Sequence, residues 1–152
     1  MQKLLISLLI LTFSQQAFCQ SKSVDKLYQQ YKDHPELFHL DLGGNFLGLA
    51  NSFNFNLDKD LSQSLTKSME KVMMYKFPKA NSTKDLDNLV KGLKRENFEL
   101  LLEAGKPSDG VAIYAKGGNR IKDLVLLVQS EELMVFEMLG DFDPELLSKF
   151  GN

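Results

Sequence analysis

The chain has 152 residues, 43% of them hydrophobic, which is enough to bury the core of one domain. Its net charge of −2 comes without a block of Lys and Arg, so nucleic-acid binding is disfavoured. After the first residues, no apolar run is long enough to cross a membrane.

The first 19 residues predict a secretory signal peptide. Lys3 supplies a positive start, and the apolar stretch Leu4–Phe13 is too short to span a bilayer as a mature helix. Ala17 and Cys19 are the small residues before the expected cut, which leaves Gln20 as the mature N-terminus. The loss of Lys3 then changes the net charge from −2 to about −3. We therefore expect an exported protein, either periplasmic or secreted.

The single cysteine leaves one alternative open. A lipoprotein would keep Cys19 as an acylated N-terminal residue and be anchored through it. Phe18 is larger than the residue that usually precedes such a cysteine, and Gln16 replaces an aliphatic residue, so cleavage after Cys19 is favoured. The mature chain then has no thiol, hence no disulfide and no thiol chemistry.

Helices and two strands alternate in the first half of the expected domain. Apolar residues recur at helical spacing after Ser23, and Pro35 ends that helix. Residues 36–42 alternate as a strand does, with His39 and Asp41 on one side. The elements expected next are a short helix at 45–53, a helix that Asp58 caps, and a strand at 72–77.

One helix and four strands are expected in the second half. Four apolar residues at helical spacing follow the cap at Ser82 or Thr83. Residues 97–104 alternate as a half-buried strand that places Phe98, Leu100, Leu102 and Ala104 on one face. The remaining elements are strands at 111–116, 121–129 and 133–139, a hairpin turn at 117–119, and a last helix that Asp143 caps.

The run LVLLV at 124–128 is apolar on both faces, which places its strand near the centre of the sheet. Short connections between the last four strands imply an antiparallel meander. We therefore expect one α+β domain over residues 20–152. It has a mostly antiparallel sheet of about six strands that ends in a four-strand meander, with helices packed on one face.

Several C-terminal motifs resemble those of a known family. They are the hairpin strand with Val111, Ile113, Tyr114 and Lys116, the apolar strand at 124–128, the acidic turn at 130–132, and Gly140–Asp143 followed by Leu146 and Leu147. The order of elements over nearly all of the mature chain is similar to the domain of unknown function 4252, found in exported proteins of Bacteroidota-type bacteria. This family implies no activity and no catalytic residues. The leader ending Ala17–Gln20 resembles the A-F-A-Q endings of such proteins, which favours cleavage before Gln20.

His39 and Asp41 form the pattern that most invites an enzymatic interpretation. Side chains at i and i+2 on a strand share a face, where they can hold a metal or act as base and orienter, with His34 and Glu36 nearby. A metal site needs a third ligand that the sequence does not supply, so an ordinary half-exposed strand face is favoured. A metal-dependent or hydrolytic enzyme centred on this pair remains the alternative.

Two other motifs have simpler structural explanations. Asp141, Asp143 and Glu145 lack the spacing of a calcium loop, and helix capping accounts for the last two. The glycines at 117–118 lie between two strands, whereas a phosphate-binding loop lies between a strand and a helix. We assign no catalytic, cofactor-binding or metal-binding residue.

Methionine and phenylalanine are abundant among the expected core positions, with core filling as the favoured role. Even so, helices on one face leave the other face of an apolar sheet without cover. An exposed apolar face marks a binding site, so we expect a non-enzymatic domain that binds an envelope protein or an apolar ligand. Self-association into a homo-oligomer through that face or a sheet edge is the other possibility.

Overall fold

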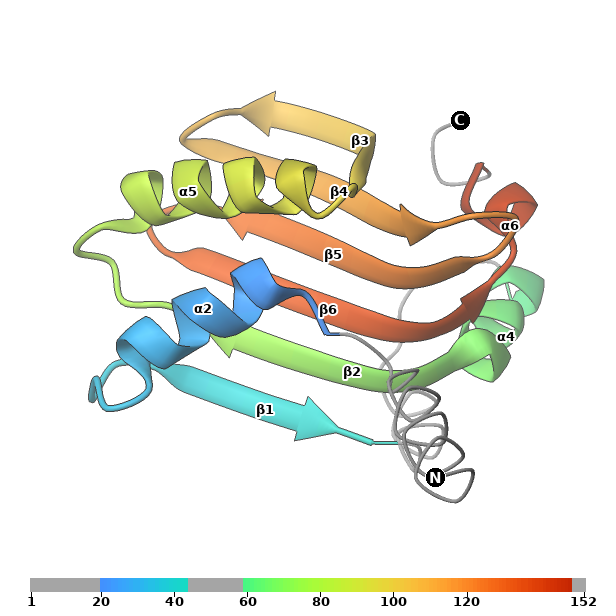
Figure 1. The fold of residues 1–152 in the computed structure, drawn as a ribbon, viewed down its shortest axis with the longest axis horizontal. Coiled ribbons are helices and arrows are strands. Elements are labelled where there is room, and N and C mark those ends of the chain that lie inside the picture. Colours follow the sequence, from blue (N-terminus) through green and yellow to red (C-terminus); the bar gives the residue numbers. More distant parts are fainter. Residues whose placement is uncertain (1–19, 44–58, 149–152) are drawn as a thin grey trace, which may run out of the picture.

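Six strands form one antiparallel sheet in the computed structural model, which describes residues 20–43 and 59–148 (Figure 1). The strand order is β1-β2-β6-β5-β4-β3, so the last four strands form a meander. The predicted α+β class and the meander are confirmed. The expected signal peptide at 1–19 and the expected short helix at 45–53 lie outside the described residues.

Each strand pairs antiparallel with its neighbours, and the apolar strand expected near the centre is there. The two central strands are β5 (Ile121–Gln129) and β6 (Leu133–Phe142). Outside them lie β2 (Met69–Lys76) and β4 (Asp109–Gly117), and the edges are β1 (Phe38–Leu42) and β3 (Glu99–Lys106). The helices are α2 (Lys22–Tyr31), α4 (Lys59–Ser68), α5 (Ser82–Arg95) and α6 (Pro144–Ser148).

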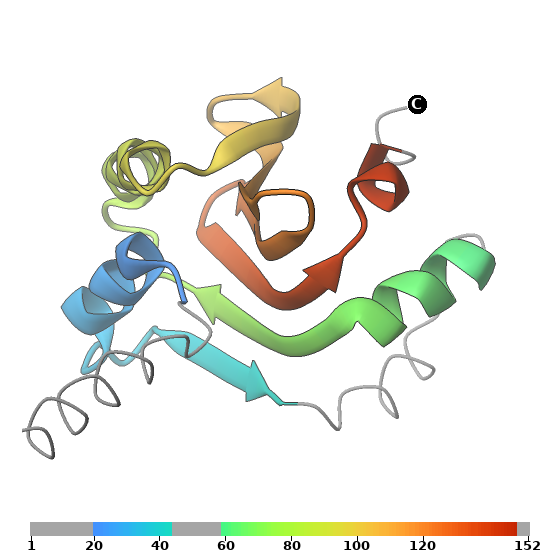
Figure 2. The ribbon, with the colours of Figure 1, turned by 45° about the vertical axis from the view of Figure 1, so that its right-hand side comes forward.

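Helices α2 and α5 cover one face of the sheet, as Figures 1 and 2 show. Their apolar stripes pack on side chains that alternate strand by strand toward them, which is the usual consequence of the two-residue period of a strand. The main core joins residues of both helices to β2, to Phe77 just after β2, and to β5 and β6: Val24, Leu27, Leu89, Leu93, Met73, Tyr75, Phe77, Val125, Leu127, Leu133 and Val135.

A second, smaller core lies on the opposite face at one end of the sheet. Leu124 belongs to it, whereas the adjacent Val125 belongs to the main core, as expected for neighbours on one strand. Leu147 of α6 packs against it, and α4 contacts both α6 and β6 there. Figure 2 shows α4 and α6 together at this end. Its buried members are Ala115, Ile121, Leu124 and Phe142.

A glycine permits the close contact between α2 and α5. A Cβ at residue 92 would lie 2.8 Å from the Cβ of Ser23 and closer still to its hydroxyl, so a side chain there would push α2 away. Helix α5 ends soon after this contact because Asn97 adopts φ 66°, the left-handed conformation that ends many helices. The N–H of Phe98 then donates to the carbonyl of Leu93 at 3.0 Å.

The expected alternation along the first strand of the meander is wrong in part. A bulge between Leu100 and Leu102 places Leu100 opposite Tyr114 and Leu102 opposite Ile113. Because Tyr114 and Ile113 are adjacent on β4, Leu100 and Leu102 lie on opposite faces. The extra residue at Leu101 therefore moves Leu102 and Ala104 to the face away from α2 and α5.

Replacement of Gly92 by leucine tests the close approach of the two helices. Leucine is a good helix former, so a loss of stability in Gly92→Leu reports the contact with Ser23 and not helix propensity. We expect the free energy of unfolding to fall by about 1–3 kcal/mol in urea titrations. Gly118→Ala is the control, because nothing lies within 4 Å of a Cβ at that position. Equal stability of the two variants would contradict the packing described.

Candidate functional site

His39 and Asp41 lie on the same side of β1, as predicted, but each has a structural partner. The imidazole of His39 stacks on the ring of Tyr75 with centroids 4.8 Å apart and is also 4.8 Å from Tyr28. Asp41 forms an ion pair with Lys71 at 3.0 Å. Within the described residues no group of three or more His, Cys, Asp or Glu is placed to hold a metal ion. The pair therefore holds β1 to α2 and β2.

The acidic motif near the C-terminus has the capping role that the sequence favoured. Asp143 Oδ1 accepts a hydrogen bond from the backbone N–H of Glu145 at 2.9 Å, at the start of α6. Asp141 pairs with Arg120 at 3.0 Å and with Lys122 at 2.7 Å. Hydrogen bonds from these two cations lower the pKa of Asp141. The expected hairpin between β4 and β5 is present, but Gly117 is the last residue of β4 and pairs with Ile121, so residues 118–120 form the connection.

An apolar surface crosses the sheet on the side away from α2 and α5. Its central row follows the strand register through all six strands, and every member is apolar: Leu40, Met74, Phe136, Leu126, Ile113 and Leu102. The next row adds Lys76 and five more apolar residues: Phe38, Met134, Val128, Val111 and Ala104. We call these two rows the open face.

The open face is only partly shielded from solvent. Its residues on the four inner strands are half-buried, whereas Phe38 and Leu40 on β1 are 49% and 38% exposed. At a strand spacing of about 4.8 Å, the row spans about 24 Å across the sheet. Among the described elements, α4 and α6 lie at one end of this face, beside the smaller core against which Ile113 packs. A continuous apolar surface of this width is typical of an interaction site.

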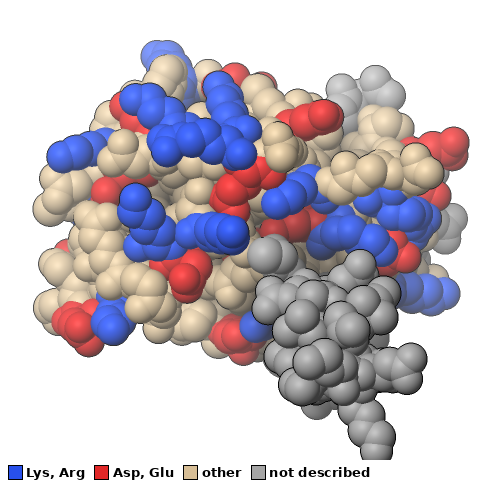
Figure 3. All heavy atoms as spheres, viewed as in Figure 1, with Lys and Arg blue, Asp and Glu red and all other residues tan. Residues whose placement is uncertain are grey.

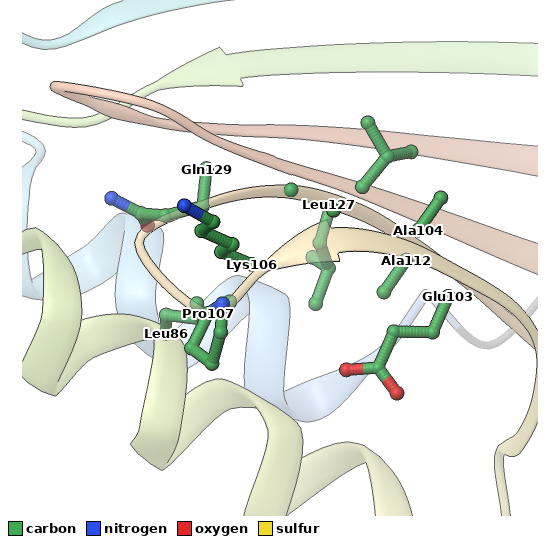
Figure 4. A pocket seen from close by; sticks show the side chains of 11 residues that line it. Leu86, Glu103, Ala104, Lys106, Pro107, Ala112, Leu127 and Gln129 are labelled. Atoms are coloured by element: carbon green, nitrogen blue, oxygen red, sulfur yellow. The ribbon is translucent and has the colours of Figure 1, made fainter.

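A small pocket lies between α5 and the β3–β4 hairpin (Figure 4). Leu86 of α5 and Pro107 of the hairpin lie on its wall, and Leu127 and Gln129 come from β5. Its volume is about 50 Å³. Sites for organic ligands usually measure about 300–1,000 Å³, so this pocket has room for water molecules and not for a substrate.

Two carboxyl groups are buried beneath the start of α2. Glu137 of β6 is 0% exposed and Asp123 of β5 is 3% exposed. The register pairs Val125 with Glu137, so the two acids are diagonal neighbours on the face that α2 and α5 cover. Burial, followed by the charge of Asp123, raises the pKa of Glu137 to about 9. Glu137 is therefore protonated at neutral pH in this environment.

The start of α2 is bound by two carboxyl groups. The backbone N–H of Ser21 donates to Glu137 Oε1 at 2.6 Å. Glu96, just beyond α5, accepts from the hydroxyl of Ser21 at 3.0 Å and from the N–H groups of Lys22 at 2.7 Å and Ser23 at 3.1 Å. Burial favours the neutral form of Glu96, but these hydrogen bonds outweigh it and lower its pKa. An ionised carboxylate at a helix N-terminus is the stabilising arrangement.

The buried acids were not predicted from the sequence. Asp123 lies in the apolar run IKDLVLLV, and Glu137 lies in the apolar run LMVFEML. A single carboxylate between apolar neighbours was the only sequence feature that could have indicated burial. A single acid in such a run also fits a solvent-facing position. Only the pairing of β5 with β6 brings the two together.

The fold and its surfaces define a small α+β domain with one helix-covered face and one apolar face. The family model described as Domain of unknown function (DUF4252) matches residues 31–150, and the chain belongs to this family. The resemblance seen in the C-terminal motifs is thereby confirmed. No curated protein and no solved structure matches the chain. No helix in the described part of the chain has the length and apolar character needed to span a membrane.

The raised pKa of Glu137 predicts a pH-dependent stability when residue 20 is peptide-bonded to a preceding residue. The folded chain holds the Glu137 proton up to about pH 9, and the unfolded chain releases it near 4.5. The stabilising contribution is thus complete below about pH 4.5 and declines as pH rises toward 9. We expect the free energy of unfolding to fall by at most about 1.4 kcal/mol per pH unit over this range.

Urea titrations of Glu137→Gln between pH 5 and 9 check this expectation. Glutamine keeps an acceptor for the Ser21 N–H and has no proton to lose, so most of the slope should disappear. Glu103→Gln, at an exposed carboxyl on β3, should keep the wild-type slope. A wild-type stability that rises between pH 5 and 9 would contradict the assigned protonation.

Glu96→Gln tests the binding of the α2 N-terminus. Loss of the negative acceptor should lower the free energy of unfolding by about 1 kcal/mol at pH 7, after allowance for partial exposure. Because the pKa of Glu96 is lowered in the folded chain, its contribution is present above about pH 4.5 and fades as pH falls below that value. The variant and the wild type should therefore converge in acid. A difference in the free energy of unfolding that persists at pH 2.5 would show that it does not come from the charge of Glu96.

Proposed function

We propose that this chain is an exported, non-enzymatic binding domain of the cell envelope whose open face docks another protein. The observation that carries the proposal is the six-residue apolar row from Leu40 to Leu102, which the strand register aligns across the whole sheet. Export, with a periplasmic or secreted location, rests on the features of residues 1–19 alone.

A protein partner fits this surface better than a small apolar ligand does. Ligands of that kind are held in concave sites that enclose most of their surface, and the pocket of about 50 Å³ beside α5 is too small for one. The open face is a broad surface with exposed margins at Phe38 and Leu40. Such a surface buries well against an apolar patch of similar breadth on another protein.

The distribution of charge argues against a membrane surface as the partner. Membrane-binding apolar patches are usually flanked by Lys and Arg that contact anionic lipids. Figure 3 shows Lys and Arg interspersed with Asp and Glu on the face that α2 and α5 cover, so the basic groups seen there do not flank the open face. The lysine within the open face, Lys76, is paired with Glu132 at 2.8 Å.

An enzyme centred on His39 and Asp41 has less support. The imidazole stacks on Tyr75 and contacts the tilted ring of Tyr28, and the carboxylate is paired with Lys71. Activation of a water or a substrate would require both groups to leave these partners. The binding proposal needs no such change.

Photo-crosslinking in cells that export the full-length chain tests the docking surface. A photo-reactive amino acid at position 40 should give a discrete crosslinked product, and the same group at position 100 should not. Leu100 is the matched control because it is apolar and 46% exposed but faces the other side, opposite Tyr114. The mass of the product separates a second copy of this chain, which would indicate self-association, from another protein.

Phe38→Lys supplies the second arm of this experiment. A charge at the margin of the docking surface should reduce the crosslinked product about tenfold or more, and Leu100→Lys should leave it unchanged. Phe38 is 49% exposed, so both variants should unfold at nearly the wild-type temperature. Equal products from positions 40 and 100, or none from either, would overturn the proposal.

A further inference from the structure

The buried acids beneath α2 lie next to the residue that signal cleavage is predicted to expose. We propose that Asp123 and Glu137 bind the α-ammonium group of Gln20 in the cleaved chain, so that export processing itself completes the core. The inference rests on the predicted cut before Gln20 and on the geometry around Ser21. It is independent of the open face.

Two hydrogen bonds hold residue 20 against the sheet. The backbone N–H of Ser21 donates to Glu137 Oε1 at 2.6 Å, and the side-chain amide of Gln20 donates to the hydroxyl of Tyr75 at 2.9 Å. Successive backbone nitrogens are at most about 3.7 Å apart, so the α-nitrogen of Gln20 lies within about 6 Å of Glu137 Oε1. An ammonium group at this position is close enough to Glu137 for a strong attraction between opposite charges.

The charge around the pair favours a cation. Within the part of the chain that the structure describes, the titratable groups that act on Glu137 are Asp123 on β5, Glu96 beyond α5 and Tyr75 on β2, and none of these three is cationic. Glu137 Oε2 is buried, and a hydrogen bond between the Glu137 and Asp123 side chains helps to raise the pKa of Glu137. Burial of two acids side by side is costly, and a group of opposite charge next to them lowers that cost.

Cleavage changes the group that faces the acids. Before the cut, the nitrogen of residue 20 is a neutral amide, and a proton on Glu137 is the means of removing the repulsion between the two carboxyls. After the cut, the same nitrogen is an amine with an ordinary pKa of about 7.7–8.0, which is largely protonated at pH 7. A carboxylate within about 6 Å then stabilises the ammonium form and raises that pKa further.

The first measurement uses the protein exported from its full-length gene. Its intact mass should correspond to a chain that begins at Gln20 with a free amine. We expect this chain to melt about 3–10 °C higher at pH 7 than a chain with one additional glycine before Gln20. In the Glu137→Gln background the difference between the two forms should disappear. In the Glu96→Gln background the difference in melting temperature should remain. This result would assign the effect to the buried acids and not to Glu96, which caps α2.

A second measurement does not depend on the stability of any variant. Competitive acylation of the exported protein gives the pKa of its α-amine, which we expect to lie about one unit or more above the ordinary value. Glu99→Gln, at an exposed acid on β3, should leave this pKa unchanged.

Three results would each overturn the proposal. The first is an α-amine of ordinary pKa in the wild-type chain, and the second is an equal melting temperature with and without the additional glycine. The third is an intact mass in which residue 20 has no free amine, because Cys19 is retained or because Gln20 has cyclised with loss of ammonia.

Discussion

The antiparallel pairing of β5 with β6 is the interaction on which the rest of the molecule depends. Both strands carry apolar side chains on both faces, so this pair supplies the base of the main core and also the middle of the open face. Helices α2 and α5 bury one side by packing on Val125, Leu127 and Val135. The other side retains partly exposed Phe136 and Leu126, which an isolated domain has no evident reason to keep apolar.

The same pair of strands carries the two buried acids, which gives the helix-covered face a polar centre. Glu137 and Glu96 bind the start of α2 from two directions, one from the sheet and one from the end of α5. The position of α2 is therefore specified by hydrogen bonds to the backbone as well as by apolar packing. Apolar contacts alone tolerate rotation of a helix, whereas these directional contacts define one orientation.

Much of the sheet could be predicted because its signals are local. The run at 124–128 indicated a central strand, the glycines at 117–118 indicated a hairpin, and the short connections indicated the meander. The bulge at Leu101 carries no such signal, since an extra residue is recognised only against a paired strand.

The candidate sites, too, could be predicted only where their signals are local in the sequence. The alternation along residues 36–42 correctly placed His39 and Asp41 on one side, but the ring of Tyr75 and the amine of Lys71 that occupy them come from another strand. The apolar character of the open face was expected from composition and strand pattern. Its alignment into one row required the register of all six strands. The acid pair could not be predicted, because Asp123 and Glu137 lie in separate segments that become neighbours only when β5 pairs with β6.

The bulge in β3 makes the two edges of the sheet unequal. Edge β1 pairs with β2 in unbroken register over all five of its residues, whereas the irregular β3 presents an interrupted row of backbone groups. Bulged edges are poor templates for another strand, and regular ones are good templates. Of the described edges, only β1 is therefore suited to accept a strand from a neighbour. A contact between two copies through β1 would use the same edge twice and close on itself, which gives a pair of molecules and no growing fibre.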